Sequence, residues 1–384
     1  MSNTTRPIPG WRRSPPSGGR VGPRINRAAC RSRCRLGPPL HSGRTCDTFA
    51  CEDRSVEIDR SDEPAYAGPL VTFNKVELVL DPAQLSGADV AILGAPMDEM
   101  VTHRPGARFG PRAIRAAYDG GPPKMYHLDL GVDPFAELHI VDHGDARVVP
   151  GDAHASHRAI RDAVTQIVAA GAVPLVLGGD HSIAYPTITG TATAHERGSM
   201  AVVQFDTHAD TATENWGVEW AHGTPFRHLV DHDVIRGDRL IQVGLRGYWP
   251  FPEEFAWMRE SGVRWHRMEE VSERGIHEVI ESVMAEMGDA EHLYLSVDID
   301  VLDPAYAPGT GTPEPGGMTT RELCRAVRRL VLERGLAGME IVEVSPPYDH
   351  AEITAMAAHR VALEALSALA LHRKGDRAAP EDPS

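Results

Sequence analysis

The sequence has 384 residues, of which 42% are hydrophobic and 24% charged, so the chain can build a large globular domain. The longest apolar run, Ile167–Gly179, spans about 13 residues and contains Pro174, whereas a membrane-spanning helix needs roughly 20. We therefore expect no membrane span. The net charge of −15 argues against general nucleic-acid binding, because affinity for phosphate requires a basic surface.

Residues 1–55 differ in composition from the rest of the chain. Up to residue 54 they hold eleven arginines and three acidic residues, a net charge of +8, which leaves −23 for the remainder. They are rich in Pro, Gly and Ser and lack apolar periodicity, so we expect a disordered tail, either genuine or added by an upstream start codon. A folded domain is then expected over residues 56–375, followed by a second disordered tail over 376–384.

Four of the five cysteines lie in the first tail, at Cys30, Cys34, Cys46 and Cys51. Their C-x3-C-x11-C-x4-C spacing is compatible with a zinc site, but the stretch lacks the apolar pattern that would fold around a metal. Only Cys324 lies in the body of the chain, which excludes a disulfide framework there and indicates a reducing compartment. We therefore expect a cytoplasmic protein.

Apolar, β-branched runs alternate with helical patterns from about residue 88. Helices are predicted, for example, over His157–Ala170 and Thr320–Arg334. Apolar strands that alternate with helices are typical of a parallel sheet covered on both faces. We predict a single three-layer α/β/α domain with a mostly parallel central sheet, in which ligands bind at the carboxyl ends of the strands. The predicted strands are Val90–Leu93, His139–Val141, Pro174–Leu177, Ala201–Phe205, Leu240–Val243, Leu293–Val297 and Met339–Val342.

Three of these strands end in side chains that bind metals. Alternate side chains of an extended segment point the same way, so the Asp and His residues that follow each strand can converge. Four carboxylates and two imidazoles are too many ligands for one ion and suit two ions that share bridging carboxylates. The six predicted ligands are His181, Asp206, His208, Asp210, Asp298 and Asp300.

A single Asp-x-Asp or Asp-x-His motif is more often a loop cap than a metal site. Three such motifs at strand ends, however, bring five carboxylates together when Asp180 is included, and these would repel one another without cations. Oxygen and imidazole ligands favour Mn²⁺, with Ni²⁺, Mg²⁺ or Zn²⁺ as alternatives. Because two neighbouring ions activate water at neutral pH, the pattern predicts a hydrolase.

Five motifs occur in the order GGDHS, FDTHAD, HGTPF, SVDIDVLDPAYAPGTGTPEPGG and EIVEVSPPYD. Together they resemble those of the ureohydrolases, the family of arginases, agmatinases and guanidino-acid hydrolases. The upstream RPGARFGPRAIR, Arg104–Arg115, is similar to the agmatinase-like branch. The resemblance covers roughly residues 88–371, which implies that residues 56–375 are a ureohydrolase catalytic domain. Thr207 departs from the usual Ala, but it lies between ligands and should point away from the metals.

The resemblance implies two Mn²⁺ ions per chain and a homo-oligomer, either a trimer or a hexamer. A hydroxide that bridges the two ions attacks the guanidinium carbon of the substrate in this family. The first ion is held by His181, Asp206, Asp210 and Asp298, and the second by Asp206, His208, Asp298 and Asp300.

Three residues acquire catalytic roles from the same resemblance. Asp210 passes the proton of the hydroxide to the leaving amine, and His222 in the His-Gly-Thr-Pro motif shuttles protons. Glu343 ends a strand and resembles the carboxylate that clamps the guanidinium. A buried carboxylate there needs a partner, and we expect the substrate cation to be that partner.

Substrate choice is expected to depend on residues 211–221, TATENWGVEWA. A substrate carboxylate would need cations, yet this segment has no Lys or Arg and instead has Glu214 and Glu219. We therefore expect agmatine, hydrolysed to putrescine and urea as in polyamine biosynthesis, although both Glu residues could equally be solvated.

Several alternatives stay open. Trp216 and Trp220 could narrow the pocket, which keeps guanidine, guanidinobutyrate and guanidinopropionate as candidate substrates, and Arg246 could bind a guanidino-acid carboxylate. From other classes, a metal-dependent deacylase or a non-enzymatic acidic metal-binding protein with a basic tail remain. The expected partner is a small guanidino substrate, with no nucleic acid and no membrane. The remaining histidines are left out as ordinary surface or core residues: His103, His127, His143 and His350.

Overall fold

The structure is a computed structural model that describes residues 71–117 and 125–375. The tails predicted over 1–55 and 376–384 lie outside the described residues, and so do the boundary at residue 56 and the four cysteines of the first tail. The described residues form an α/β domain built on one nine-stranded sheet.

The nine strands pair only in parallel, in the order β1-β3-β2-β4-β9-β8-β5-β6-β7. All seven predicted strands occur within a few residues of their predicted bounds. The two edge strands were missed, because β1 has only two residues and β7 reads RWHR, with both arginines exposed. The strands are β1 (Glu77–Leu78), β2 (Val90–Ala95), β3 (Ile140–Asp145), β4 (Val173–Gly178), β5 (Met200–Phe205), β6 (Leu240–Leu245), β7 (Arg264–Arg267), β8 (His292–Asp298) and β9 (Gly338–Val342).

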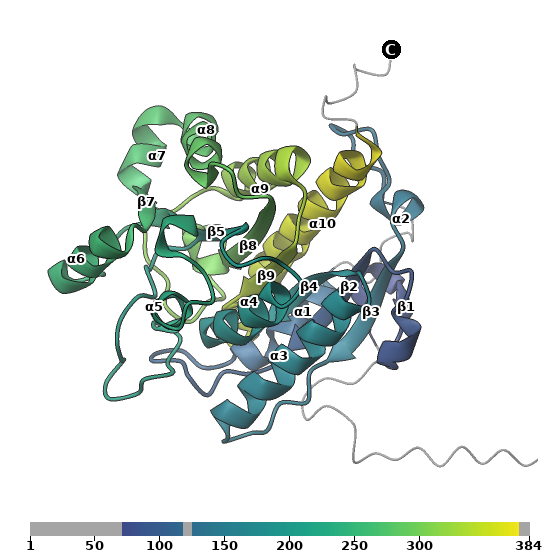
Figure 1. Ribbon diagram of the computed structural model, residues 1–384, viewed down its shortest axis with the longest axis horizontal. Coiled ribbons are helices and arrows are strands. Elements are labelled where there is room, and N and C mark those ends of the chain that lie inside the picture. Colours follow the sequence, from purple (N-terminus) through teal and green to yellow (C-terminus); the bar gives the residue numbers. More distant parts are fainter. Residues whose placement is uncertain (1–70, 118–124, 376–384) are drawn as a thin grey trace, which may run out of the picture. The chain divides into compact units, whose positions relative to one another are not determined.

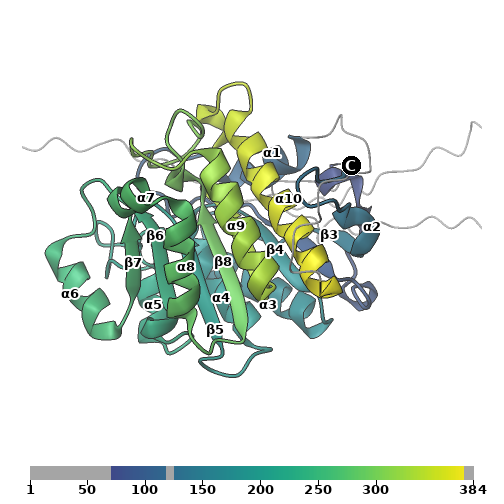
Figure 2. The same ribbon diagram turned by 90° about the horizontal axis from the view of Figure 1, so that it is seen from above.

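Helices cover both faces of the sheet, which confirms the three-layer α/β/α class (Figures 1 and 2). Helices α3, α4 and α5 pack side by side on one face, and α1, α10, α9, α8 and α7 cover the other. Their bounds are α1 (Gly110–Ala116), α2 (Pro134–Glu137), α3 (Ala153–Ala169), α4 (Ala184–Ala192), α5 (Pro225–Asp231), α6 (Pro252–Ser261), α7 (Met268–Arg274), α8 (Ile276–Met287), α9 (Thr320–Arg334) and α10 (Ile353–Lys374).

Capping residues explain why the start of one helix was predicted correctly and that of another was not. α9 has its predicted bounds, because Thr319 and Glu322 form a capping box at its start. α3 begins four residues before the prediction, since the side chain of Asp152 accepts a hydrogen bond from the backbone N–H of Ala155 at 2.9 Å.

The strand order decides where the chemistry lies. Strands β8 and β9, made late in the chain, insert between β4 and β5, so the sheet centre reads β4-β9-β8-β5. The carboxyl ends of these four parallel strands therefore meet at one edge of the sheet. Such a switch in strand order is where α/β sheets bind their ligands.

Among the described residues, α10 is the one helix that is long and apolar enough, by length and composition, to cross a bilayer. However, 83% of its most apolar stretch is buried inside the domain, where α10 packs along α9 and against α1. Its apolar surface therefore belongs to the core.

Glu364 on α10 anchors this helix through a buried charged group. Its carboxylate accepts hydrogen bonds from His127 Nε2 at 3.0 Å and from Arg328 Nε at 2.8 Å, and Arg360 Nε donates at 2.9 Å. Burial alone would raise the pKa of Glu364, but these partners outweigh it and lower the pKa to about 2. His127 is thus a core residue, as the sequence suggested.

Replacing Glu364 by Gln should destabilise the fold by about 2 kcal/mol at pH 7, because a buried charge shared by three donors is removed. The folded pKa lies below the unfolded value, so this contribution is complete above about pH 5 and is lost as the pH falls toward 2. Urea unfolding of both proteins from pH 7 to pH 3 should show the difference in unfolding free energy shrinking. A difference that stays constant with pH would contradict the assigned charge.

Candidate metal centre and substrate pocket

Three strands bring the six predicted ligands to one place at the carboxyl edge of the sheet. Each ligand lies in the last residue of a strand or in the turn that follows it, so the backbone of the sheet fixes its position. The six are His181, in the 3-10 turn after β4; Asp206, His208 and Asp210, in the loop after β5; and Asp298 and Asp300, at the end of β8 and in the turn beyond it.

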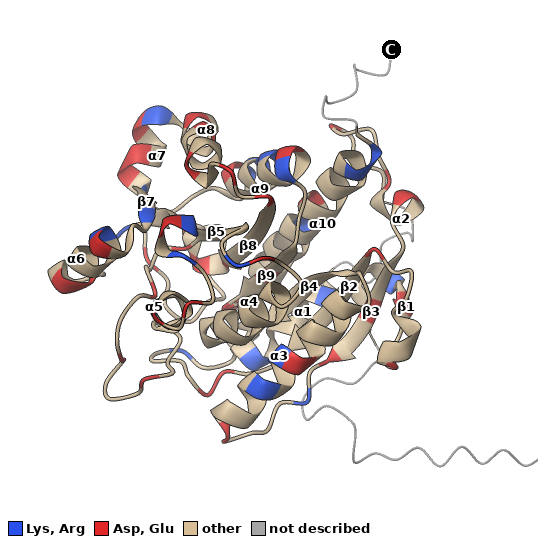
Figure 3. Ribbon diagram, viewed as in Figure 1, with Lys and Arg blue, Asp and Glu red and all other residues tan. Residues whose placement is uncertain are grey.

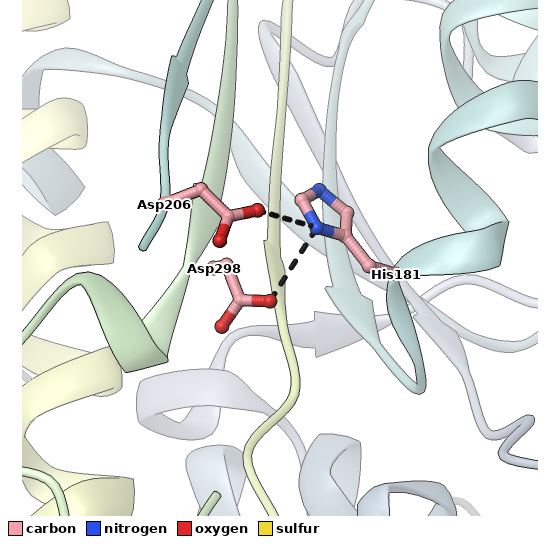
Figure 4. Close-up of side chains that lie close together, drawn as sticks. All are labelled: His181, Asp206 and Asp298. Carbon is pink, nitrogen blue, oxygen red and sulfur yellow. Dashed lines mark ion pairs between the residues drawn. The ribbon is translucent and has the colours of Figure 1, made fainter. Parts of the chain in front are cut away.

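His181 lies at the centre of the first group of ligands (Figure 4). Its Nδ1 lies 3.0 Å from Oδ2 of Asp206 and 3.4 Å from Oδ2 of Asp298. A third oxygen, Oδ2 of Asp210, lies 2.9 Å away. Although three oxygens surround it, this Nδ1 has no hydrogen-bond partner of acceptable geometry among the described residues. Nitrogen and oxygen lone pairs that face one another in this way repel unless a proton or a metal ion lies between them.

His208 belongs to a second group beside the first. Its Nδ1 lies 3.2 Å from Oδ2 of Asp300 and 3.6 Å from Oδ1 of Asp206. Asp206 therefore presents one carboxylate oxygen to each histidine, which is the geometry of a bridging ligand. Asp206, His208 and Asp300 could hold a second ion, as His181, Asp206 and Asp298 could hold the first.

Hydrogen bonds aim the ligand carboxylates. Asp206 accepts from the backbone N–H of His208 at 2.6 Å and from Nε2 of Gln204 at 2.7 Å. Asp298 accepts from the backbone N–H of Asp300 at 2.8 Å. Asp210 has φ 52°, a left-handed backbone that a non-glycine residue adopts at some cost. The carboxylates are therefore held in place by the backbone itself.

The pKa shifts of the ligand carboxylates indicate whether metal ions suit the cluster. Burial, followed by the charges of Asp300 and Asp206, raises the pKa of Asp298 well above its usual value. Burial and the charge of Asp206 raise the pKa of Asp210 to about 6. The pKa of Asp300 is raised as well, chiefly by burial, whereas the two histidines lower that of Asp206. Three of the four carboxylates are thus unfavourable as anions in this water-poor place. Divalent cations remove that penalty, so the donor set fits a pair of metal ions.

Asp180, the fifth carboxylate of the sequence argument, serves another purpose. One of its oxygens accepts from the backbone N–H of Ser182 at 3.0 Å, and the other accepts from that of Met100 at 3.1 Å. One oxygen thus binds the turn that carries His181, and the other binds the segment that follows β2. Asp180 therefore supports the ligand loop and is not itself a candidate ligand.

His222 and Glu343 form a buried pair beside the metal groups. Nδ1 of His222 lies 2.9 Å from Oε1 of Glu343, and its Nε2 accepts from the backbone N–H of Thr102 at 3.2 Å. Burial lowers the pKa of His222, but the charge of Glu343 outweighs it and leaves this pKa above the ordinary value. From the sequence we expected a substrate cation as the partner of Glu343. In the structure Oε1 faces His222 and also accepts from the backbone N–H of His181 at 2.9 Å. Oε2 of Glu343 is buried and has no hydrogen bond within the described part of the chain.

A cavity of about 1170 Å³ opens onto this chemistry. His208, Asp210, His222 and Asp298 line it, together with residues 212–216 and parts of 249–260. The second of these segments includes α6, whose acidic residues appear red in Figure 3. The polar centre is thus reached through a pocket whose outer walls come from two loops and one short helix.

The two tryptophans of the 211–221 segment have different positions. Trp216 lines the pocket and is 87% exposed, whereas Trp220 turns away and stacks on His228 with ring centroids 4.2 Å apart. The two glutamates divide in the same way, because Glu214 lines the pocket and Glu219 does not. Trp216 is therefore placed to narrow the pocket as expected, whereas Trp220 and Glu219 do not line it.

Arg246 is not free to bind a substrate carboxylate. Its Nη2 donates to the carbonyl oxygens of Asp300 at 2.8 Å and Glu314 at 2.6 Å, and its Nη1 donates to that of Val301 at 3.2 Å. The side chain ties the strand ends to the 312–317 loop and does not line the pocket. The sequence showed an arginine after a strand but could not show that backbone carbonyls use its donors.

Two arginines that we did not expect from the sequence line the pocket. Arg104 lies in the segment between β2 and α1, and Arg227 lies on α5. The guanidinium of Arg227 lies 4.3 Å from the ring centre of Trp257, and its Nε donates to Asp231 at 2.7 Å. Neither arginine lies in residues 211–221, so the charge of that segment alone does not describe the charge of the pocket.

Thr207 and the histidines left out of the prediction are accounted for. The backbone N–H of Thr207 donates to Asp300 at 3.3 Å, and its side chain is buried. His143 bonds to the carbonyl oxygen of Val79 at 2.6 Å and is a core residue, while His350 is exposed. His103 lines the pocket, which the sequence did not indicate.

A fully parallel α/β sheet that carries two adjoining acid–histidine groups at its carboxyl edge defines a binuclear metal hydrolase. Residues 88–368 match the model of the Arginase family. The chain belongs to the Arginase family, the ureohydrolases.

Solved and curated relatives agree with this assignment. The structure of proclavaminate amidinohydrolase from Streptomyces clavuligerus superimposes with a TM-score of 0.72 and 36% identity, covering 80% of this chain and 99% of that one. The mitochondrial agmatinase of Gallus gallus is 40% identical over 75% of this chain and 84% of its own length. The guanidinobutyrase of Pseudomonas aeruginosa is 37% identical over 80% and 94%. Relatives with different substrates are therefore almost equally similar to this chain.

Asp206→Asn should weaken the binding of both metal ions, because Asp206 faces both histidines, whereas His208→Asn should weaken only one. Purified proteins would be loaded with Mn²⁺, desalted and measured for metal content per chain. We expect about two ions in the wild type, one in His208→Asn and fewer than one in Asp206→Asn. Equal metal retention by the two variants would contradict a bridging role for Asp206.

Proposed function

We propose that this chain hydrolyses the guanidino group of agmatine to give putrescine and urea. The observation that carries the reaction class is the pair of ligand groups that share Asp206 beside a pocket of about 1170 Å³. Membership of the Arginase family supports hydrolysis of this kind and leaves the substrate open.

We propose that the two groups hold two Mn²⁺ ions, with Ni²⁺, Mg²⁺ or Zn²⁺ as alternatives. Each group offers carboxylate oxygens and one imidazole, a donor set that suits Mn²⁺. When bound, such a pair of ions supplies an activated water at neutral pH and polarises the group under attack.

The residues of the chain manage the protons of the reaction. Asp210 lines the pocket beside the ligands, so its carboxylate is placed to hold a proton on its way to the leaving amine. Nε2 of His222 is an acceptor while Nδ1 faces Glu343, so His222 can take up a proton and pass it on. Glu343 orients His222 through Oε1, and its unpaired Oε2 is the atom left for the guanidinium.

The charge of the outer pocket supports agmatine, whose far end is an amine. The carboxylates of Glu214, Glu253, Glu254, Glu260 and Glu314 line this region, against the two arginines. The exposed face of Trp216 adds a surface on which a short cation can lie.

A guanidino acid is the second candidate substrate, and Arg104 and Arg227 favour it. Both guanidinium groups lie in the pocket wall, where one could accept a substrate carboxylate. The guanidinobutyrase and guanidinopropionase of Pseudomonas aeruginosa are 37% and 38% identical to this chain. Guanidinobutyrate and guanidinopropionate therefore belong in any substrate test.

Urea release should be measured with agmatine, arginine, guanidinobutyrate, guanidinopropionate and guanidine under Mn²⁺. We expect kcat/KM for agmatine to exceed that for each other compound by at least about tenfold, which corresponds to roughly one ionic contact. Arg227→Ala should leave the agmatine value within about twofold, as should the control Arg259→Ala, which lies on α6 outside the pocket lining. A wild type that prefers guanidinobutyrate, and loses that preference in Arg227→Ala, would establish the second candidate instead.

His222→Asn should lower kcat by about 10² to 10⁴, since a positioned proton carrier contributes that much. Metal content should stay at the wild-type level, because His222 is not in either ligand group. His103→Asn, an exposed change in the same pocket, is the matched control and should keep kcat. Loss of metal together with activity in His222→Asn would contradict the assigned role.

We further propose a cytoplasmic homo-oligomer, trimer or hexamer, that binds neither nucleic acid nor membrane. A buried free Cys324 and the charge of −23 outside the first tail support the compartment and the lack of nucleic-acid affinity. The mass in solution and a filter-binding assay at low salt test these proposals directly.

A further inference from the structure

The side of the His181 ring that faces away from the carboxylates is also bound to protein. Nε2 of His181 lies 2.9 Å from Oγ of Ser296 on β8, and this hydroxyl donates to Oε1 of Glu340 on β9 at 2.8 Å. All three residues are fully buried, each with 0% of its surface exposed. A buried histidine, serine and glutamate thus form a continuous chain of hydrogen bonds behind the metal centre.

The proton count along this chain fixes the state of the histidine. A serine hydroxyl has one proton. When the carboxylate of Glu340 is ionised, Ser296 gives its proton to Glu340, so Oγ accepts from Nε2–H of His181. The proton of a neutral imidazole is then on Nε2, and the lone pair is on Nδ1, the atom that faces Asp206 and Asp298. Only this tautomer can bind a metal ion through Nδ1.

Glu340 is well suited to hold the far end of the chain. Its second oxygen, Oε2, lies within hydrogen-bonding distance of Oγ1 of Thr187 on α4, a hydroxyl that also reaches the carbonyl oxygens of Ile183 at 2.9 Å and Ala184 at 3.2 Å. Ser296 and Glu340 face each other on paired strands, because Ser296 is in register with Glu340 in the β8–β9 ladder. The rigid centre of the sheet therefore sets the geometry of the chain.

We propose that Ser296 and Glu340 are positioning residues that hold His181 in its metal-binding tautomer and so set the affinity of the His181 site. The proposal rests on the metal centre of the proposed function. Partners of this kind behind a ligating histidine typically change metal affinity by about 10- to 100-fold.

The second histidine provides an internal comparison. His208 is partly exposed, and among the described residues no hydrogen bond to its Nε2 supports it from behind. The chain through Ser296 and Glu340 reaches only His181. Loss of that chain should therefore weaken one of the two metal sites and spare the other.

Calorimetric titration of metal-free protein with Mn²⁺ tests this selectivity. Ser296→Ala and Glu340→Gln should each weaken one binding step by about 10- to 100-fold and leave the other within about twofold. The controls Ser367→Ala and Glu364→Gln replace equally buried residues on α10 and should keep both steps. Unchanged affinity in folded Ser296→Ala, or equal weakening of both steps, would overturn the proposal.

Nitrogen-15 NMR of the wild type with labelled histidine gives an answer even where a variant does not fold. In protein loaded with diamagnetic Zn²⁺, the His181 signal, assigned by its loss in His181→Asn, should show a proton on Nε2. A deprotonated Nε2 would overturn the proposal. Urea release tests the proposed function separately, because a chain that binds metal through this tautomer yet hydrolyses no guanidino compound contradicts only that function. A wild type that binds no divalent cation contradicts both.

Discussion

Repulsion among four carboxylates at one water-poor edge of the sheet is the constraint on which the rest of the molecule depends. Asp206, Asp210, Asp298 and Asp300 come within a few ångströms of two histidines, and only positive charge among them makes the arrangement stable. The backbone is committed to this grouping, with left-handed conformations at Asp210 and Glu343. Strain of this kind persists where the surrounding structure dictates it, and here the central strands do so.

The molecule separates the chemistry from the choice of substrate. The ligands and His181's supporting chain come from the buried central strands β4, β5, β8 and β9. The outer pocket comes from residues 212–216 and from α6 and the segment before it, which contain most of the exposed large side chains near the site. Changes in these outer walls need not disturb the metal centre, which fits the nearly equal similarity to relatives with different substrates.

The sequence predicted the sheet well, and it singled out six candidate ligands that the structure brings to one edge, because both depend on local patterns. A buried parallel strand is a continuous apolar run in the sequence. Asp and His at alternate positions directly after such a run can be recognised without knowing any long-range contact. The outer pocket depends on long-range contacts, and there the prediction was incomplete. Nothing local shows that Trp220 stacks on His228, or that backbone carbonyls occupy Arg246, or that Arg227 reaches the pocket from α5. The role of Ser296 likewise appears only when β8 and β9 are paired.

The apolar helix α10 has a consequence for how the protein is made. It follows every other element of the domain in the chain, yet it covers the same face of the sheet as α1 and α9. Until α10 has been synthesised, the part of that face beside α1 and α9 lacks its cover, and the nascent domain presents apolar surface there. Completion of this face of the domain must therefore wait until α10, which ends at Lys374, has left the exit tunnel. Chaperones that shield apolar surface should bind the chain until then.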